Sequence, residues 1–156
     1  IDGIVTRLSN GYGAPMHKKV DCWMLLVNDL CRQAVESGKM VLKSSGVQRR
    51  DFIPMSSVCK ILSSFFTKDK QTIGDGIFNV GSGQSMTVWE MACLTKNRCE
   101  KQLNQKISLS RTGTSNKTTD LLYSIKKLDN AGIAIKVDHV SEIDMLVAFC
   151  INNFCK

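Results

Sequence analysis

Three short segments of this sequence carry residues whose types and spacing could bind a phosphorylated ligand. The first is residues 7–13, RLSNGYG, in which Asn10 follows a run that is typical of a strand. An asparagine at the carboxyl end of a strand lies at the edge where open α/β sheets hold ligands, and its amide offers both donors and acceptors. The alternative is that Asn10 only supports the glycine-rich turn, and the residues themselves leave both interpretations open.

The second segment is residues 49–53, RRDFI, where Arg50 stands beside an extended apolar stretch. A guanidinium there could hold a phosphate through paired hydrogen bonds. The alternative is a surface salt bridge between Arg50 and Asp51 or another acid.

The third segment is residues 78–83, FNVGSG, a strand followed by a glycine loop. It lacks the third glycine and the acidic residue of a dinucleotide fingerprint, so we expect no cofactor pyrophosphate at this loop.

Other chemistries find little support in the sequence. His17 and His139 are far apart along the chain and no G-x-S-x-G motif occurs, which disfavours a hydrolase. The seven cysteines form no C-x-x-C pair, and several fall on apolar helix faces. We therefore predict reduced, buried thiols in place of a metal site or a disulfide framework.

The charge of the chain favours an anionic ligand. The formal net charge is +7, and excess Lys and Arg raise the local concentration of a polyanion or of a phosphorylated small molecule. The basic residues are scattered along the sequence, and aromatic residues make up only 6% of it, so the stacking surface of a single-strand binder is not apparent. The sequence predicts no nucleic-acid partner.

The elements that must position these segments alternate between strand and helix. In the first half we predict a strand at 3–8, a helix capped by Asp21 and ended by Gly38, strands at 40–42 and 50–53, and a helix capped by Ser56 or Ser57. A strand at 77–80 and a helix behind the capping box Thr87–Glu90 follow. The rest is a polar loop at 106–120, with at most a short strand at 107–109, and two helices capped by Ser124 and Ser141. His139 is expected at the surface, and His17 in a loop that borders the ligand. This pattern indicates one mixed α/β unit over 156 residues.

Length and hydropathy set the cellular context that we expect. No uninterrupted apolar run approaches the roughly 20 residues that span a bilayer, and the first residues have no signal-peptide character. The sequence thus predicts a soluble, cytoplasmic protein without a membrane partner. Its first residues already have the pattern of a strand, which suggests that the chain begins in the middle of a fold.

Taken together, the three segments resemble the carboxyl-terminal part of the extended short-chain dehydrogenase/reductase family, which includes NAD-dependent nucleotide-sugar epimerases and dehydratases. Residues 7–13 are similar to the family motif R-x-x-N-x-Y-G-P, except that Ala14 stands between Gly13 and Pro15. Residues 46–52 are similar to the motif G-x-x-x-R-D-F, and residues 78–83 to F-N-V-G-S-G. Weaker similarity continues with RTG at 111–113 for R-P-G, and with SIKKL at 124–128 for D-x-S-K-L. The resemblance covers nearly the whole chain.

The resemblance implies roles for particular residues. In the substrate site, Asn10 would contact the sugar nucleotide near the reaction centre, Arg50 its diphosphate and Arg111 its phosphate or ribose, with Asn79 as a further, weaker substrate-binding candidate. Cofactor-binding positions would be Ser9 and Tyr12. The resemblance implies no catalytic residue and no metal ligand in this chain.

The implied fold is the carboxyl-terminal portion of a Rossmann-type α/β protein, with the dinucleotide-binding part absent. Residues 1–156 would form the substrate-binding part and would include edge strands of the missing sheet. Neither a G-x-x-G-x-x-G loop nor a Tyr-x-x-x-Lys motif occurs, so we expect no hydride transfer by this chain alone.

The resemblance also implies the setting of the full-length protein. That protein would use NAD or NADP, with none bound by this chain alone, and would act on a nucleoside-diphosphate sugar as an isomerase or lyase in surface polysaccharide synthesis. The partner of this chain would be the missing amino-terminal half or another chain, and the full-length protein a homodimer. The alternative is a noncatalytic binding or interaction module derived from the same family.

Overall fold

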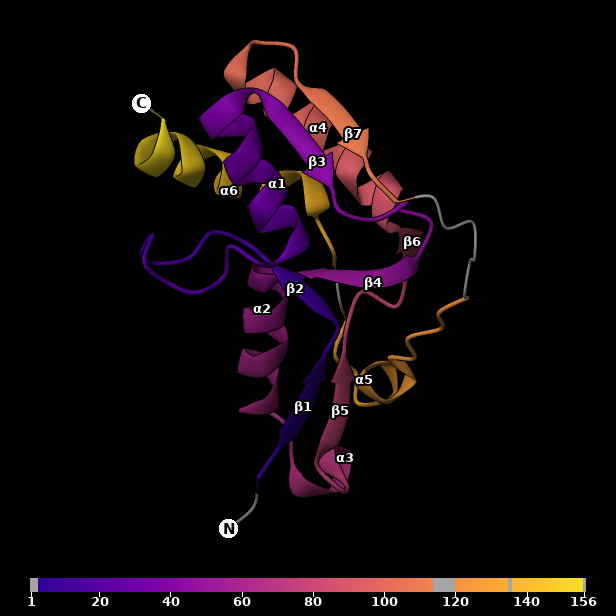
Figure 1. Cartoon of the computed structure of the whole chain (residues 1–156). Helices are drawn as coiled ribbons and strands as arrows, with labels where there is room; N and C mark the ends of the chain where they lie inside the picture. Colours follow the sequence, from indigo (N-terminus) through magenta and orange to yellow (C-terminus); the bar gives the residue numbers. More distant parts are fainter. Residues whose placement is uncertain (1–2, 114–119, 135, 156) are drawn as a thin grey trace.

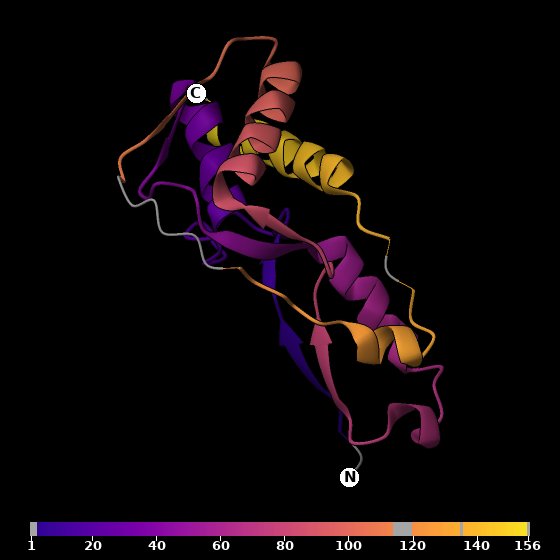
Figure 2. The same ribbon diagram turned by 90° about the vertical axis from the view of Figure 1, so that its right-hand side faces the viewer.

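In the part of the chain that the structure describes, three small sheets follow one another, with helices packed beside them (Figures 1 and 2). The computed structural model describes residues 3–113, 120–134 and 136–155. At the amino-terminal end, β1 (Val5–Leu8) pairs in parallel with β5 (Ile77–Val80). The next sheet has the order β2 (Asn10–Tyr12), β4 (Arg49–Pro54), β6 (Ser85–Thr87), and the last joins β3 (Lys39–Leu42) to β7 (Ser108–Arg111) in parallel.

The helices form two groups that match two hydrophobic clusters. Helices α1 (Leu26–Ser37), α4 (Val88–Leu103) and α6 (His139–Phe154) pack against one another beside β3 and β7. Helices α2 (Met55–Phe65) and α5 (Lys126–Asn130) cover one side of the β1–β5 pair, where Phe78, Val80 and Leu128 are buried. The short α3 (Lys70–Ile73) leads into β5. The α/β fold class is as the sequence predicts.

Three cysteine side chains lie at the centre of the three-helix group. Cys31 from α1, Cys99 from α4 and Cys150 from α6 are each 0% exposed, as the apolar helix faces predict. Burial raises the pKa of the Cys150 thiol to about 12 and that of Cys31 well above its ordinary value, so both stay protonated. The prediction of buried thiols is wrong for Cys59 and Cys155, which are exposed.

The predicted elements are present, with corrections at several boundaries. Helix α1 begins at Leu26 and not near Asp21, because the preceding loop is held by other bonds: the Trp23 indole donates to the Lys18 carbonyl, and the buried Asn28 side chain bonds both backbone groups of Gly13. The helix ends at Gly38 as predicted, in a left-handed conformation with φ of 67°.

Two short strands were not expected from the sequence. Strand β2 runs through the stretch that reads as a turn, and β6 precedes the predicted capping box of Thr87 and Glu90, which is formed. Strand β7 is longer than the short strand expected at 107–109.

The caps of the other helices also differ from those predicted. Helix α2 follows Pro54 without a side-chain cap, α5 follows Ile125 likewise, and α6 is capped by Asp138, whose carboxylate accepts from the Ser141 amide. None of the helices in the described ranges is long and apolar enough to cross a membrane.

Candidate functional site

Asn10 and Arg50, which are 40 residues apart in sequence, are brought into contact by the pairing of β2 with β4. Asn10 lies opposite Phe52 in this parallel pair. Its side-chain amide donates to the Asp51 carbonyl at 2.9 Å, which fixes the orientation of the amide group. Its remaining oxygen faces Arg50, so two of the predicted site residues form one unit.

The Arg50 guanidinium is held by two neutral acceptors. Nη1 donates to Asn10 Oδ1 at 3.2 Å, and Nη2 donates to Gln48 Oε1 at 3.2 Å. Neither partner carries charge, so the positive charge of Arg50 remains available to an anion. These two bonds fix the direction of an exposed side chain.

The predicted alternative, an ion pair between Arg50 and Asp51, is not formed. Successive side chains of a strand point to opposite faces, and Asp51 is 0% exposed on the face opposite Arg50. Its carboxylate accepts from Ser82 N and Ser82 Oγ, each at 2.8 Å. Asp51 therefore ties β4 to the loop after β5.

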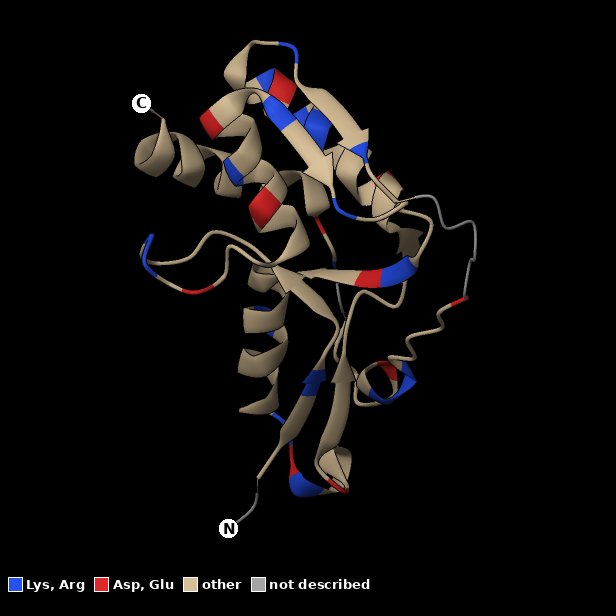
Figure 3. Ribbon diagram, viewed as in Figure 1, with Lys and Arg blue, Asp and Glu red and all other residues tan. Residues whose placement is uncertain are grey.

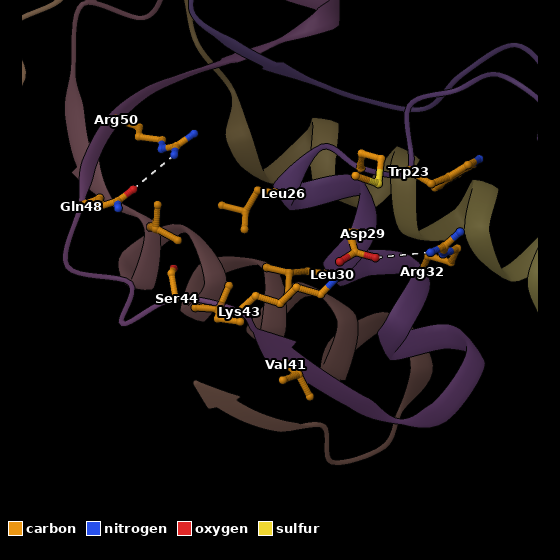
Figure 4. Close-up of a pocket in the computed structure, with 13 residues that line it drawn as sticks. Trp23, Leu26, Asp29, Leu30, Arg32, Val41, Lys43, Ser44, Gln48 and Arg50 are labelled. Carbon is orange, nitrogen blue, oxygen red and sulfur yellow. Dashed lines mark hydrogen bonds and ion pairs between the residues drawn. The ribbon is translucent and has the colours of Figure 1, made fainter. Parts of the chain in front are cut away.

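Two cavities meet at Arg50. The larger, of about 520 Å³, lies between α1 and the end of β3 and is lined by Trp23, Asp29, Arg32, Lys43 and Gln48 as well as Arg50 (Figure 4). The smaller, of about 260 Å³, has Asn10 and Arg50 at its polar side and Met24, Leu25 and Phe52 among its apolar walls. Arg50 thus borders both spaces.

The charges around the larger cavity are unequally compensated. Arg32 lies 3.4 Å from Asp29 and 4.0 Å from Glu36, so acidic groups on its own helix balance it. Among the described residues, Arg50 and Lys43 have no acidic partner within salt-bridge distance. In the view of Figure 3, basic residues are spread over the molecule, including β3 and β4 beside this cavity. The cavity is therefore suited to an anionic ligand.

Solved structures identify the fold that carries these cavities. A UDP-N-acetylglucosamine 4-epimerase from Methanobrevibacter ruminantium, solved with UDP-N-acetylmuramic acid, matches with a TM-score of 0.68 and 22% identity over 96% of this chain and 46% of that one. A dTDP-glucose 4,6-dehydratase from Bacillus anthracis with NAD gives 0.68 and 18% over 96% and 44%. The protein RMD from Pseudomonas aeruginosa with NADPH gives 0.73 and 13% over 96% and 48%.

The fold is that of the extended short-chain dehydrogenases. This chain spans slightly less than half the length of each of these structures, as expected for a carboxyl-terminal part of a Rossmann-type protein. No protein-family model matches the sequence, and no curated protein matches it either.

Within the extended short-chain dehydrogenase fold, the two residues predicted to face a cofactor are largely enclosed. Tyr12 is 1% exposed, and its hydroxyl lies 2.7 Å from His139 Nδ1. Burial, with a contribution from Glu142, raises the pKa of Tyr12, and burial lowers that of His139, so this pair is neutral. His139, expected at the surface, is partly buried, with its ring stacked against that of Tyr12. Ser9 Oγ is buried and has no hydrogen-bond partner among the described residues.

The glycine loop after β5 uses its polar groups internally. Besides the bonds from Ser82 to Asp51, the Gln84 amide donates to Ser82 Oγ. Gly81 is required for packing, because a Cβ there would lie 2.6 Å from the Tyr123 ring and 2.7 Å from Asp51 Oδ1. The backbone amides of Ser82 and Gln84 are thus used within the protein. The contacts predicted for Ser9 and Tyr12 with a cofactor stay predictions.

Arg111 lies apart from the cavities at Arg50. It ends β7, where Nη1 donates to the Ser45 carbonyl at 2.9 Å and the guanidinium lies 4.8 Å from the centre of the Trp89 ring. These contacts hold the loop after β3 in place. Its predicted contact with the ligand phosphate or ribose stays a prediction.

Asn79 lies in another part of the molecule, on β5 opposite Arg7 of β1. Its amide donates to the Ser124 carbonyl at 3.2 Å. It lines a separate cavity of about 490 Å³ with Arg7 and Lys126. The structure thus places Asn79 away from Asn10 and Arg50, and its role in substrate binding stays a prediction.

The sequence interpretation missed Gln48, Asp29 and Lys43. A signal existed for Gln48, because a residue two positions before Arg50 on a strand points to the same face. Asp29 and Lys43 meet the same cavity only because α1 returns beside the end of β3, which no local pattern shows. His17, expected to border the ligand, accepts a bond from the Lys19 amide in an exposed loop. In the described residues, no cluster of His, Cys, Asp or Glu is arranged for a metal ion.

Proposed function

We propose that this chain is the substrate-binding part of an NAD- or NADP-dependent nucleotide-sugar epimerase or dehydratase. The observation that carries this proposal is the Arg50 guanidinium, oriented by Asn10 and Gln48 at the point where two cavities meet. A diphosphate bridges a nucleoside and a sugar, so a fixed cation between two spaces of different size suits such a ligand.

The two cavities fit the two ends of a nucleoside-diphosphate sugar. The larger has polar and charged groups among its lining residues, which suits a nucleoside with its ring and hydroxyls. The smaller ends at Asn10, whose amide would face the sugar ring. The fold neighbours include an enzyme solved with a UDP-sugar and others with NAD or NADPH, which supports this choice of ligand class.

Hydride transfer would need a partner segment. The dinucleotide cradle would come from an amino-terminal half or from another chain, and residues 1–156 would add strands to its sheet. In the described residues β1 is paired on one side only, by β5, and Val5 and Leu8 are 57% and 47% exposed. We propose that this edge joins the cofactor-binding half. The full-length protein would then be a cytoplasmic isomerase or lyase that forms a homodimer and acts in surface polysaccharide synthesis.

The test is the affinity of the chain for nucleoside diphosphates, measured by isothermal titration calorimetry. Arg50→Ala is expected to weaken binding about tenfold or more, because it removes a charge-assisted phosphate contact. The matched control is Arg7→Ala, which removes an exposed arginine on another cavity. Equal affinity of the Arg50→Ala variant and the parent would overturn the placement of the diphosphate.

A noncatalytic interaction module is the second candidate, and the exposed edge of β1 favours it. It predicts no measurable affinity of the parent chain for any nucleoside diphosphate. It also predicts that binding to a partner chain survives Arg50→Ala and is lost when β1 is altered.

A further inference from the structure

We infer that the larger cavity is built to hold a guanine base, with Asp29 and Lys43 as the residues that select it. This inference rests on the proposed function, since it concerns the nucleoside end of the same ligand. Asp29 and Lys43 both line the cavity that Arg50 borders. In Figure 4, Arg50 and Gln48 lie at one side of this cavity, and Asp29, Arg32 and Trp23 lie at the other.

The Asp29 carboxylate is held in place and retains accepting capacity. It lies in the first turn of α1, with Oδ2 accepting from Gln33 Nε2 at 2.8 Å and Oδ1 accepting weakly from Arg32 Nη2 at 3.4 Å. An ionised carboxylate offers about four lone-pair sites, so two helix partners leave room for a ligand that donates two hydrogen bonds. Its side chain is 28% exposed, at the cavity wall.

Lys43 supplies the complementary group. It follows the last residue of β3 and, in Figure 4, its side chain extends toward α1, the helix that carries Asp29. Among the described residues it has no acidic partner within salt-bridge distance and no side-chain hydrogen bond. An ammonium has only donors, so its partner must be an acceptor on the ligand.

An acid and a cation on one cavity match a single base edge among the common nucleobases. Guanine presents two adjacent N–H donors, which a carboxylate can accept together, and next to them the O6 acceptor, which suits an ammonium. Uracil and thymine present one N–H between two carbonyl oxygens, and those oxygens repel a carboxylate. Adenine and cytosine place a ring acceptor beside their amino group, which leaves one carboxylate oxygen without a donor.

The experiment compares guanosine, uridine, thymidine and adenosine diphosphates as titrants of the intact chain. We expect guanosine diphosphate to bind about tenfold or more tightly than the other three, in line with the discrimination of a bidentate base contact. Asp29→Asn should remove most of this preference by weakening the binding of guanosine diphosphate, without weakening that of uridine diphosphate. Inosine diphosphate, which lacks the amino group, should bind the parent more weakly than guanosine diphosphate.

The matched control is Glu36→Gln, which removes the other acid beside Arg32 but does not line the cavity. It should keep the guanine preference. Lys43→Gln is the second variant, since Lys43 is exposed and has no partner that folding requires. It should weaken the binding of guanosine diphosphate more than that of the other three. Circular dichroism melting of each variant reports whether it folds.

The outcomes separate this inference from the proposed function. If all four diphosphates bind equally, or if Asp29→Asn weakens all of them by the same factor, base selection by Asp29 is overturned. The second result would mean that Asp29 acts on a group that all four ligands share and not on the base. In either case Arg50→Ala would still weaken every ligand. If no diphosphate binds, the proposed function itself is lost.

Discussion

At the scale of single residues, two neighbours on β4 divide the work of the site between them. Arg50 points outward to the cavities, and Asp51 points inward to the loop after β5. Asp51 also supplies the carbonyl that orients Asn10. The orientation of Asn10 and Arg50 thus depends on Asp51, whose buried carboxylate no ligand would touch. A change at Asp51 should therefore affect folding first and binding second.

We expect Asp51→Asn to lower the free energy of unfolding by about 1–3 kcal/mol, because one of the two donors of Ser82 would face an amide NH₂ group and remain unsatisfied. Urea denaturation followed by circular dichroism measures the change. Asp21→Asn, in the loop before α1, is the control and should leave the midpoint unchanged. A midpoint equal to that of the parent in the Asp51→Asn variant would show that this carboxylate is not a structural anchor.

The sequence identified part of the site and not its extent. Asn10 and Arg50 were predicted separately and prove to be in contact. Their contact depends on the pairing of β2 with β4, and β2 is a strand that the sequence did not predict. Tyr12 and Arg111 could not be assigned in the same way, because burial of the tyrosine and the contact of the arginine with Trp89 depend on packing between distant segments.

At the scale of the elements, contacts with neighbouring segments decide where helices begin, and the type of the capping residue alone does not. Aspartate is a favoured capping residue, yet α1 starts at Leu26 and not near Asp21. The side chains of Trp23 and Asn28 hold the preceding loop through hydrogen bonds to its backbone. Ser141 was predicted to cap α6 and instead donates to the cap, Asp138. Strands β2 and β6 are each three residues long, too short for any periodicity to reveal.

The bond between α4 and α6 gives the three-helix group a dependence on pH. Arg98 donates to Asp144 through Nε at 2.7 Å and Nη2 at 2.5 Å, and these bonds lower the pKa of Asp144 below its ordinary value. A carboxyl with a lowered folded pKa stabilises the protein above its unfolded pKa of about 3.9, and this contribution disappears as the pH falls through the folded pKa.

We therefore expect Asp144→Asn to lower the free energy of unfolding by about 1 kcal/mol at pH 7 and to have little effect at pH 2. Urea denaturation of both proteins across this range measures the difference. A difference that stays constant from pH 7 to pH 2 would show that the carboxylate charge is not its source.

At the scale of the whole molecule, the two hydrophobic clusters are unequally enclosed. The three-helix group surrounds its core, whereas the β1–β5 pair has helices on one side, with Val5 and Ile77 on the other side 57% and 39% exposed. The edge of β3, by contrast, is blocked by the Gln33 side chain, which accepts from the Val41 amide. The edge of β1 is thus more suited to joining another strand than the edge of β3 is.

This difference predicts how the chain behaves on its own. We expect it to associate with itself in a concentration-dependent way, and Val5→Lys to suppress that association, because a lysine on an exposed strand opposes pairing. Sedimentation velocity over a range of concentrations measures it. Val41→Lys, at an exposed residue of β3 (40%), is the control and should associate as the parent does. Equal association of all three proteins would place the contact elsewhere.

The three cysteines at the centre of the helical group give the protein an internal reporter of its own opening. Cys31, Cys99 and Cys150 come from three different helices and are fully enclosed, while Cys59 and Cys155 are open to solvent. A thiol reagent would therefore label the native protein at the exposed sites quickly and at the central ones only when the helices separate. The mass added over time would count opening events, without any engineered probe.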